Sequence, residues 1–215
     1  DGGIRAVFYR YHDAIHMFSR GDWPQAEVED FFRRHPAKVV SMSEEDARTL
    51  APLFPGYGLE LSHVITATKT MTGREDLDIR PAGREDAGAI AALMMRDATY
   101  NTVYNYDELY EQTIERLESG FGRLFVIRRD GRVIATNCTA AENEDMAVIS
   151  GLVTDPAERG QGLGRAITAY TWNLVRSEGK MGLAHLACDN DNTVRLHRQM
   201  GYDFLGVRAR FLKEQ

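Results

Sequence analysis

The sequence has no apolar run long enough to cross a lipid bilayer. Its longest apolar stretches, such as Ala87 to Met95, fall well short of the roughly 18 residues that a spanning helix needs. Long blocks of lysine and arginine are also missing, and the net charge is −6. Nucleic-acid binding depends on clustered cations that face phosphates. We therefore expect neither a membrane nor a nucleic-acid partner.

Cysteine is scarce, since the 215 residues contain only Cys138 and Cys188. Their separation excludes the C-x-x-C spacing of zinc sites and redox pairs. Both lie in apolar, strand-like segments with no helix terminus or histidine beside them. We expect buried thiols in a reducing compartment rather than nucleophiles or metal ligands. The prediction is a cytoplasmic protein without a metal site.

The composition that remains is that of a globular protein, with 43% hydrophobic, 27% charged and 9% aromatic residues. The length exceeds that of one small domain and falls short of two full-sized ones. A polar, glycine-containing stretch at 70–76 separates two regions of different texture. We predict an N-terminal mixed α/β appendage over residues 1–76 and a second domain over residues 77–215.

The N-terminal region contains several short elements. Apolar residues from Ile4 to Phe18 recur at helical spacing, which predicts a helix over 4–18. The further predicted elements are a helix from Pro24 toward Arg34, a strand over 38–42, a helix that begins at Ser43, and a segment, 59–67, that fits either helix or strand.

Strand and helix patterns alternate from Leu77 onward. The dipeptide Asp130-Gly131 lies between two apolar runs and indicates a hairpin, because both turn positions tolerate positive φ. The run 146–154 is almost continuously apolar or small, as in a strand covered on both faces. A helix and another strand follow it, which predicts a parallel crossover unit over 146–188. The predicted fold class is α/β (α+β mixed sheet), with helices on both faces.

A glycine-rich turn, Arg159-Gly160-Gln161-Gly162-Leu163-Gly164-Arg165, lies between the apolar strand and the helix that follows. Glycines let the backbone approach a ligand closely, and the amides that begin a helix attract anions. The turn is either an anion cradle, most simply for a pyrophosphate, or only a tight connection. Its spacing fits neither the dinucleotide fingerprint G-x-G-x-x-G nor the P-loop G-x-x-x-x-G-K-S/T.

The turn resembles the R/Q-x-x-G-x-G/A motif of the GNAT superfamily of N-acetyltransferases, as Arg159-x-x-Gly162-x-Gly164. Two further segments resemble the same family in the right order, 79–87 upstream and 189–202 downstream. The resemblance extends from Leu77 to Lys213 and implies a GNAT-like acetyltransferase fold for this region. It says nothing about residues 1–76.

The resemblance implies acetyl-coenzyme A as a co-substrate. Backbone amides of the turn would hold its pyrophosphate, and its pantetheine arm would lie between the strands 146–154 and 183–188. Amides at strand ends, outside the ladder, supply the donors that a developing oxyanion needs. The residues implied to contact the co-substrate are Val153, Thr154, Arg159, Gly160, Gln161, Gly162, Leu163, Gly164, Arg165 and Asn190.

The segment that follows the cradle departs from the family pattern at one position. Many GNAT enzymes place a tyrosine after the leucine of the last short helix, but here Leu196 precedes His197. A histidine in this position can protonate the departing thiolate, contact the co-substrate or simply pack. Glu142 and Glu144 are weak candidates for a general base, and His185 is expected to be a buried histidine instead. An amine that loses its proton through water needs no single base.

The predicted activity is transfer of an acetyl group to a primary amine of a small molecule or peptide by direct attack. The tyrosine-rich segment 98–110, the loop 141–145 and the N-terminal region are expected to build the acceptor pocket, although those tyrosines can equally cover the core. Two alternatives remain open: a non-catalytic sensor of acyl-coenzyme A, and a transferase for longer acyl groups. We expect a monomer or homodimer.

Overall fold

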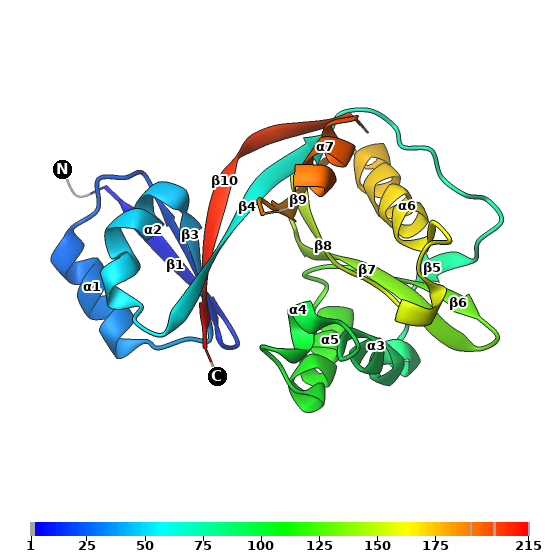
Figure 1. Ribbon diagram of the computed structural model, residues 1–215, viewed down its shortest axis with the longest axis horizontal. Coiled ribbons are helices and arrows are strands. Elements are labelled where there is room, and N and C mark those ends of the chain that lie inside the picture. Colours follow the sequence, from blue (N-terminus) through cyan, green and yellow to red (C-terminus); the bar gives the residue numbers. More distant parts are fainter. Residues whose placement is uncertain (1–2, 190, 200, 215) are drawn as a thin grey trace. The chain divides into compact units, whose positions relative to one another are not determined.

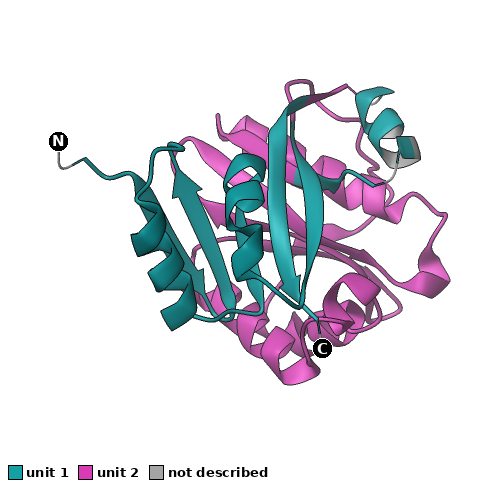
Figure 2. Cartoon of the chain, turned by 60° about the vertical axis from the view of Figure 1, so that its left-hand side comes forward, with its two compact units in different colours: residues 1–65, 185–200, 204–215 teal, residues 66–184, 201–203 magenta. Residues whose placement is uncertain are grey.

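The computed structural model describes residues 3–189, 191–199 and 201–214. Its contacts divide the chain into two compact units, coloured separately in Figure 2: unit 1 comprises residues 1–65, 185–200 and 204–215, and unit 2 comprises residues 66–184 and 201–203. The units therefore divide the chain differently from the predicted domains 1–76 and 77–215, since unit 1 also contains C-terminal segments.

The N-terminal segment forms a hairpin rather than the predicted helix. Strand β1 (Ala6–Tyr11) pairs antiparallel with β2 (Ala14–Ser19). His12 lies in the turn with φ +48°, a value outside the helical region. Ile15 and Met17 are buried two residues apart, which is the period of a strand. The prediction of a helix over 4–18 is wrong: the residues that enter the core, Ala6, Phe8, Ile15 and Met17, alternate along the strands, whereas Phe18 is 54% exposed.

The other predicted elements of the N-terminal region are confirmed. Helix α1 (Gln25–Arg34), strand β3 (Val39–Ser43) and helix α2 (Glu44–Leu50) lie where the sequence predicts them. Ser43 begins α2, and its hydroxyl accepts a hydrogen bond from the Asp46 amide at 3.0 Å. A short 3-10 helix (Ala51–Leu53) follows α2. The ambiguous segment 59–67 belongs to a strand, β4 (Tyr57–Ala67).

The strands of unit 1 lie in the order β1-β2-β3-β10-β4, where β10 is Tyr202–Lys213. Strand β3 pairs antiparallel with β10 on one side and parallel with β2 on the other. Helices α1 and α2 contribute side chains to a core on one face of this sheet. Helix α7 (Asp191–Gln199) precedes β10 in the chain.

The strands of unit 2 lie in the order β9-β8-β7-β6-β5 (Figure 1). All neighbours are antiparallel except β8 and β9, which are parallel and joined through helix α6. Asp130 and Gly131 have φ values of +50° and +75°, which confirms the predicted hairpin. The strand bounds are Ile79–Pro81 for β5, Leu124–Arg129 for β6, Arg132–Glu142 for β7, Met146–Thr154 for β8 and Met181–Ala187 for β9.

Helices cover both faces of the unit 2 sheet (Figure 1). Helices α3 (Ala87–Met94) and α5 (Tyr106–Ser119) pack on one face, and α6 (Leu163–Ser177) packs on the other. The short helix α4 (Ala98–Asn101) lies between α3 and α5 in the chain. The α/β fold with a mixed sheet is thus confirmed. Within the described residues, no helix is both long and apolar enough to span a membrane.

Candidate functional site

The predicted cradle lies where strand β8 passes into helix α6. The chain leaves β8 at Thr154, makes a 3-10 turn (Pro156–Glu158) and enters α6 after Gly162. Gly160 and Gly162 have φ values of +81° and +76°, which side-chain-bearing residues rarely adopt. Among the described residues, no side chain caps this helix end. The first amides of α6 are therefore available to an anion.

A β-bulge deforms β8 just before the cradle. The register pairs Cys138 with Ser150 and Thr136 with Val153, so two residues of β8 oppose one residue of β7. Gly151 lies within this bulge with φ +66°, and a Cβ there would lie 2.7 Å from the Cys138 Sγ. A lone glycine in a strand often marks a bulge, and that signal was available in the sequence.

The described pairing of β8 with β9 ends just before the bulge. The two strands pair from Met146 to Ile149 of β8 and from Met181 to Ala184 of β9. The following β8 residues, 150–154, have no β9 partner among the described pairs. The described pairing thus ends at Ile149 and Ala184, both in unit 2, and the separation of the two strands beyond this point stays a prediction.

Arginine side chains hold the end of β8. Arg159 Nε donates to the Thr154 carbonyl at 3.3 Å, and its Nη2 lies 3.2 Å from Asp97 Oδ2. Asp155 is only 3% exposed and accepts from Arg96 Nη1 at 2.6 Å. These contacts fix the entry to the cradle loop and orient the Arg159 guanidinium back over β8.

Gln161, in the middle of the cradle loop, has two arginine contacts. Arg129 Nη1 donates to its side-chain oxygen at 3.0 Å, and Arg74 Nη1 donates to its main-chain carbonyl at 2.8 Å. Arg165 is exposed and makes no ion pair with any described residue. The contact of Arg74 was not predicted, because a polar linker residue 87 positions away carries no local signal.

The remaining predicted contact residues differ in what the structure describes. Val153 and Leu163 are buried, with exposures of 1% and 2%, so only their backbone can face a ligand. Asn190 lies outside the described residues. His197 is half-buried on α7 and belongs to unit 1. Its predicted role stays a prediction.

Glu142 is held by cations at the far end of the β7–β8 hairpin. Its carboxylate accepts from Arg123 Nε at 2.7 Å and from Lys180 Nζ at 2.8 Å. Burial alone would raise its pKa, but the bonds from Arg123, Lys180 and Thr139 outweigh burial and bring the pKa to about 2. Glu178 also pairs with Arg123, at 2.6 Å. A carboxylate this acidic is a weak base, which argues against the predicted catalytic role.

Glu144 and His185 are both exposed. Glu144 lies in the turn after β7, on the side of the hairpin opposite the cradle. His185 keeps part of its surface exposed, but protein atoms crowd its imidazole enough for desolvation to act on it, so the expectation of a buried histidine holds only in part. Desolvation, followed by the charges of Arg208 and Arg210, lowers the pKa of His185 to about 4. The imidazole is neutral at pH 7.

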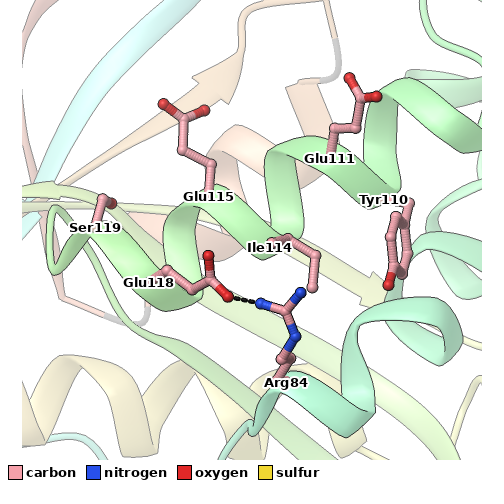
Figure 3. A pocket seen from close by; sticks show the side chains of 7 residues that line it. All are labelled: Arg84, Tyr110, Glu111, Ile114, Glu115, Glu118 and Ser119. Atoms are coloured by element: carbon pink, nitrogen blue, oxygen red, sulfur yellow. Dashed lines mark ion pairs between the residues drawn. The ribbon is translucent and has the colours of Figure 1, made fainter.

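The tyrosine-rich segment divides between core and surface. Tyr100 and Tyr104 pack against the α3–α5 core, whereas Tyr106 and Tyr110 are 42% and 37% exposed. Tyr110 lines a pocket of about 470 Å³ on α5, with three glutamates and Arg84 (Figure 3). Glu118 points toward Arg84 and pairs with it. The pocket lies on the α3–α5 side of the sheet, opposite α6, and does not include the loop 141–145.

The two cysteines show no nucleophilic character. Cys138 is buried, as expected, and burial raises the pKa of its thiol. Cys188 is half-buried, and its pKa is also raised by burial. Within the described part of the chain, no group of three or more His, Cys, Asp or Glu residues could hold a metal ion.

Comparisons with known proteins agree with this arrangement. A family model described as the acetyltransferase (GNAT) family matches residues 89–202. A GCN5-related N-acetyltransferase from Kribbella flavida is 19% identical with a TM-score of 0.62, over 94% of this chain and 81% of that one. A GNAT-family acetyltransferase from Colwellia psychrerythraea is 12% identical with a TM-score of 0.62, over 99% of this chain and 82% of that one. A Drosophila protein is 16% identical with a TM-score of 0.65, over 96% of this chain and 73% of that one. A search of curated proteins found no match.

Proposed function

Because the chain belongs to the GNAT family of acetyltransferases, we propose that it transfers an acetyl group from acetyl-coenzyme A to a primary amine. The acceptor is a small molecule or a peptide. The observation that carries the proposal is the uncapped start of α6 at Gly162, which the segment 155–161 connects to the bulged strand β8. Acyl transfer in general follows from the family, and the acetyl donor and the amine acceptor are the proposed part.

The cradle loop fits the pyrophosphate of acetyl-coenzyme A. The first amides of α6 and the positive end of its dipole favour a bound anion. Arg165 adds a cation without an intramolecular ion pair among the described residues. A Cβ on Gly164 would lie 3.3 Å from Thr154 Oγ1, so a side chain there would crowd the strand end that a ligand must approach.

The thioester would lie along the end of β8, on the edge for which no β9 pair is described; on the other edge Val153 and Thr154 pair with β7. Amides near Val153 and Thr154 are proposed to polarise its carbonyl, since donors outside the ladder can follow the charge onto the oxygen. The amine nitrogen attacks the carbonyl carbon, the carbon–sulfur bond breaks, and the thiolate leaves. His197 is proposed to protonate that thiolate, and the amine loses its proton to water. The engaged carboxylate of Glu142 takes no part in this scheme.

A second candidate function is non-catalytic binding of acyl-coenzyme A. One observation favours it. Of the two predicted base candidates, Glu142 is the partly buried one, and its carboxylate pairs with Arg123 and Lys180. A cradle can bind the co-substrate without a base nearby. The two functions differ in whether free coenzyme A is released in the presence of an amine.

Thermal melting with ligands tests the cradle first. Acetyl-coenzyme A at about 100 times its dissociation constant should stabilise the protein by about 2.7 kcal/mol. S-acetylpantetheine keeps the thioester but lacks the pyrophosphate, so it should stabilise far less at the same concentration. Absence of any shift with acetyl-coenzyme A would reject both candidate functions.

Thiol release then separates the two functions. Free thiol is measured with acetyl-coenzyme A and a panel of amines, amino acids and peptides. Release that depends on one class of amine supports acetyl transfer. Stabilisation by acetyl-coenzyme A without release for any acceptor supports the binding protein instead.

A further inference from the structure

The face of the unit 1 sheet opposite α1 and α2 carries charged side chains. Ala209 and Phe211 of β10 are buried in the core under the helices. Because side chains alternate along a strand, Arg208 and Arg210 lie on the other face. Both guanidinium-bearing residues are half-buried.

Neighbouring strands extend this face into a row. The register aligns Tyr9 with His16, His16 with Ser41, and Ser41 with Arg210. Adjacent strands lie about 4.8 Å apart, so these four side chains are neighbours across four strands. Phe18, two residues after His16, lies on the same face. We call this set the cationic face; it comprises Tyr9, His16, Phe18, Ser41, Arg208 and Arg210.

The charges on the cationic face do not balance. Arg210 Nη2 donates to Glu60 Oε2 at 2.6 Å, but no carboxylate among the described residues pairs with Arg208. Arg208 Nη2 lies 3.1 Å from His16 Nδ1, and its guanidinium lies 5.2 Å from the Phe18 ring centre. The buried Nε of Arg210 has no hydrogen-bond partner in the described structure. Two guanidiniums and one carboxylate leave one positive charge.

His16 does not add to this charge. Desolvation, followed by the charges of Arg208 and Arg210, lowers the pKa of His16 to about 4. The neutral ring can therefore accept the hydrogen bond from Arg208 at pH 7. Desolvation also lowers the pKa of Arg208, as expected for a guanidinium held away from water without a counter-ion.

Exposed apolar groups lie beside the unpaired guanidinium. Tyr9 is 47% and Phe18 is 54% exposed, and Val7, aligned with Phe18 in the register, is 49% exposed. Single exposed apolar residues are ordinary, but here they adjoin one another and a cation. A ligand with an anionic end and an apolar body would satisfy both.

We propose that the cationic face binds a small organic monocarboxylate with an apolar or aromatic body. The planar fork of Arg208 matches a carboxylate in two parallel hydrogen bonds. The single uncompensated charge matches a monoanion rather than a phosphate dianion. Phe18 and Tyr9 contact the apolar body. This site belongs to unit 1 alone and does not depend on the proposed acetyl transfer.

The test compares 3-phenylpropanoate with 3-phenylpropanamide, which has the same shape without the charge. Titration calorimetry on the full chain at pH 7 should give at least tenfold tighter binding of the acid. The nitrogen resonance of His16 Nδ1 should also move, because Arg208 turns from the imidazole to the ligand. Equal affinity of acid and amide, or tighter binding of inorganic phosphate than of the acid, overturns the proposal.

Two variants locate the site. Arg208→Gln should lower the affinity for 3-phenylpropanoate at least tenfold, while Arg33→Gln on the exposed surface of α1 should leave it within twofold. Phe18→Ala should lower the affinity for 3-phenylpropanoate severalfold and leave the affinity for acetate unchanged. This variant still tests the proposal if Arg208→Gln does not fold. Unchanged affinity in a folded Arg208→Gln or in Phe18→Ala contradicts the assignment.

Discussion

The cradle of unit 2 and the cationic face of unit 1 both suit anions, but they use different donors. The cradle relies on the backbone amides of one helix end, and its shape depends on Gly160 and Gly162. The cationic face relies on side chains from separate strands, with Arg208 as the unpaired charge. Ligand affinity at a backbone site should fall when the backbone conformation changes and should tolerate exchange of nearby side chains. Ligand affinity at a side-chain site should fall when one of its charged side chains is replaced.

A third cluster shows what balanced charges do. Arg123 and Lys180 face Glu142 and Glu178 in unit 2, so two cations meet two carboxylates. Every charge there has an internal partner, which indicates a structural role. The lone positive charge of the cationic face is the contrast that suggests a ligand.

The largest effect is expected from Gly162→Val. Valine cannot readily adopt φ +76°, so the first amides of α6 should lose their orientation. Acetyl-coenzyme A affinity, measured by calorimetry, should fall at least 100-fold. Gly179→Val is the matched control, because Gly179 lies at the other end of α6 with φ +79° and open space around it. If both variants bind acetyl-coenzyme A equally, the backbone cradle is excluded.

His197→Phe tests whether turnover needs a residue of unit 1. Loss of a general acid typically costs about 10²-fold or more in rate, so kcat should fall by about that factor while acetyl-coenzyme A affinity is retained. His35→Phe replaces an exposed histidine at the end of α1 and should leave kcat unchanged. A raised KM with unchanged kcat would assign His197 to co-substrate contact instead.

Glu142→Gln tests the balanced cluster. The pKa of Glu142 is lowered to about 2 from 4.5, so its contribution to stability is complete above pH 4.5 and is lost as pH falls through about 2. With solvent screening included, the substitution should lower the free energy of unfolding at pH 7 by about 2 kcal/mol. Urea unfolding at several pH values measures this free energy, and the difference in unfolding free energy between the variant and the wild type should shrink below pH 4.5.

Glu144→Gln is the neighbouring control for Glu142→Gln. Glu144 is exposed, so its substitution should change the free energy of unfolding by less than about 0.5 kcal/mol. Acetyl-coenzyme A affinity should be unchanged in both variants. A loss of turnover in Glu142→Gln without a loss of stability would restore Glu142 as a catalytic candidate.

The smallest effect is expected from Arg74→Gln. The variant loses the hydrogen bond from Arg74 to the Gln161 carbonyl but keeps the glycines and amides of the cradle. Acetyl-coenzyme A affinity should fall only about two- to fivefold, as for one exposed, charge-assisted bond. Arg80→Gln, another exposed arginine of unit 2, should have no effect. A loss as large as that of Gly162→Val would mean that side chains dominate the cradle.

The conformation of the cradle loop could be predicted from the sequence because its determinants are local, while its role as an anion site stays a prediction. Glycines at fixed spacing, an apolar strand before them and an amphipathic helix after them lie within about thirty residues of one another. The bulge at Gly151 adds geometry that periodicity alone does not describe. The contact of Arg74 was missed because it joins positions far apart in the sequence.

The cationic face could not be predicted, for the same reason. His16, Ser41 and Arg208 become neighbours only through the order β2-β3-β10. The helix predicted over 4–18 would have placed His16 on a different surface altogether. The hairpin was missed because its turn uses His12 at positive φ rather than the glycine or asparagine that usually indicates such a turn.

The placement of β10 in unit 1 has a consequence for synthesis. Ala209 and Phe211 complete a core whose other members, such as Val40 and Met42, come from the first quarter of the chain. The ribosome makes about 5–20 residues per second, so the N-terminal strands wait about 8 to 33 seconds for their last neighbour. The hairpin β1–β2 and helix α1 must remain incompletely packed throughout that interval. The core of unit 1 is therefore complete only after β10 has been synthesised.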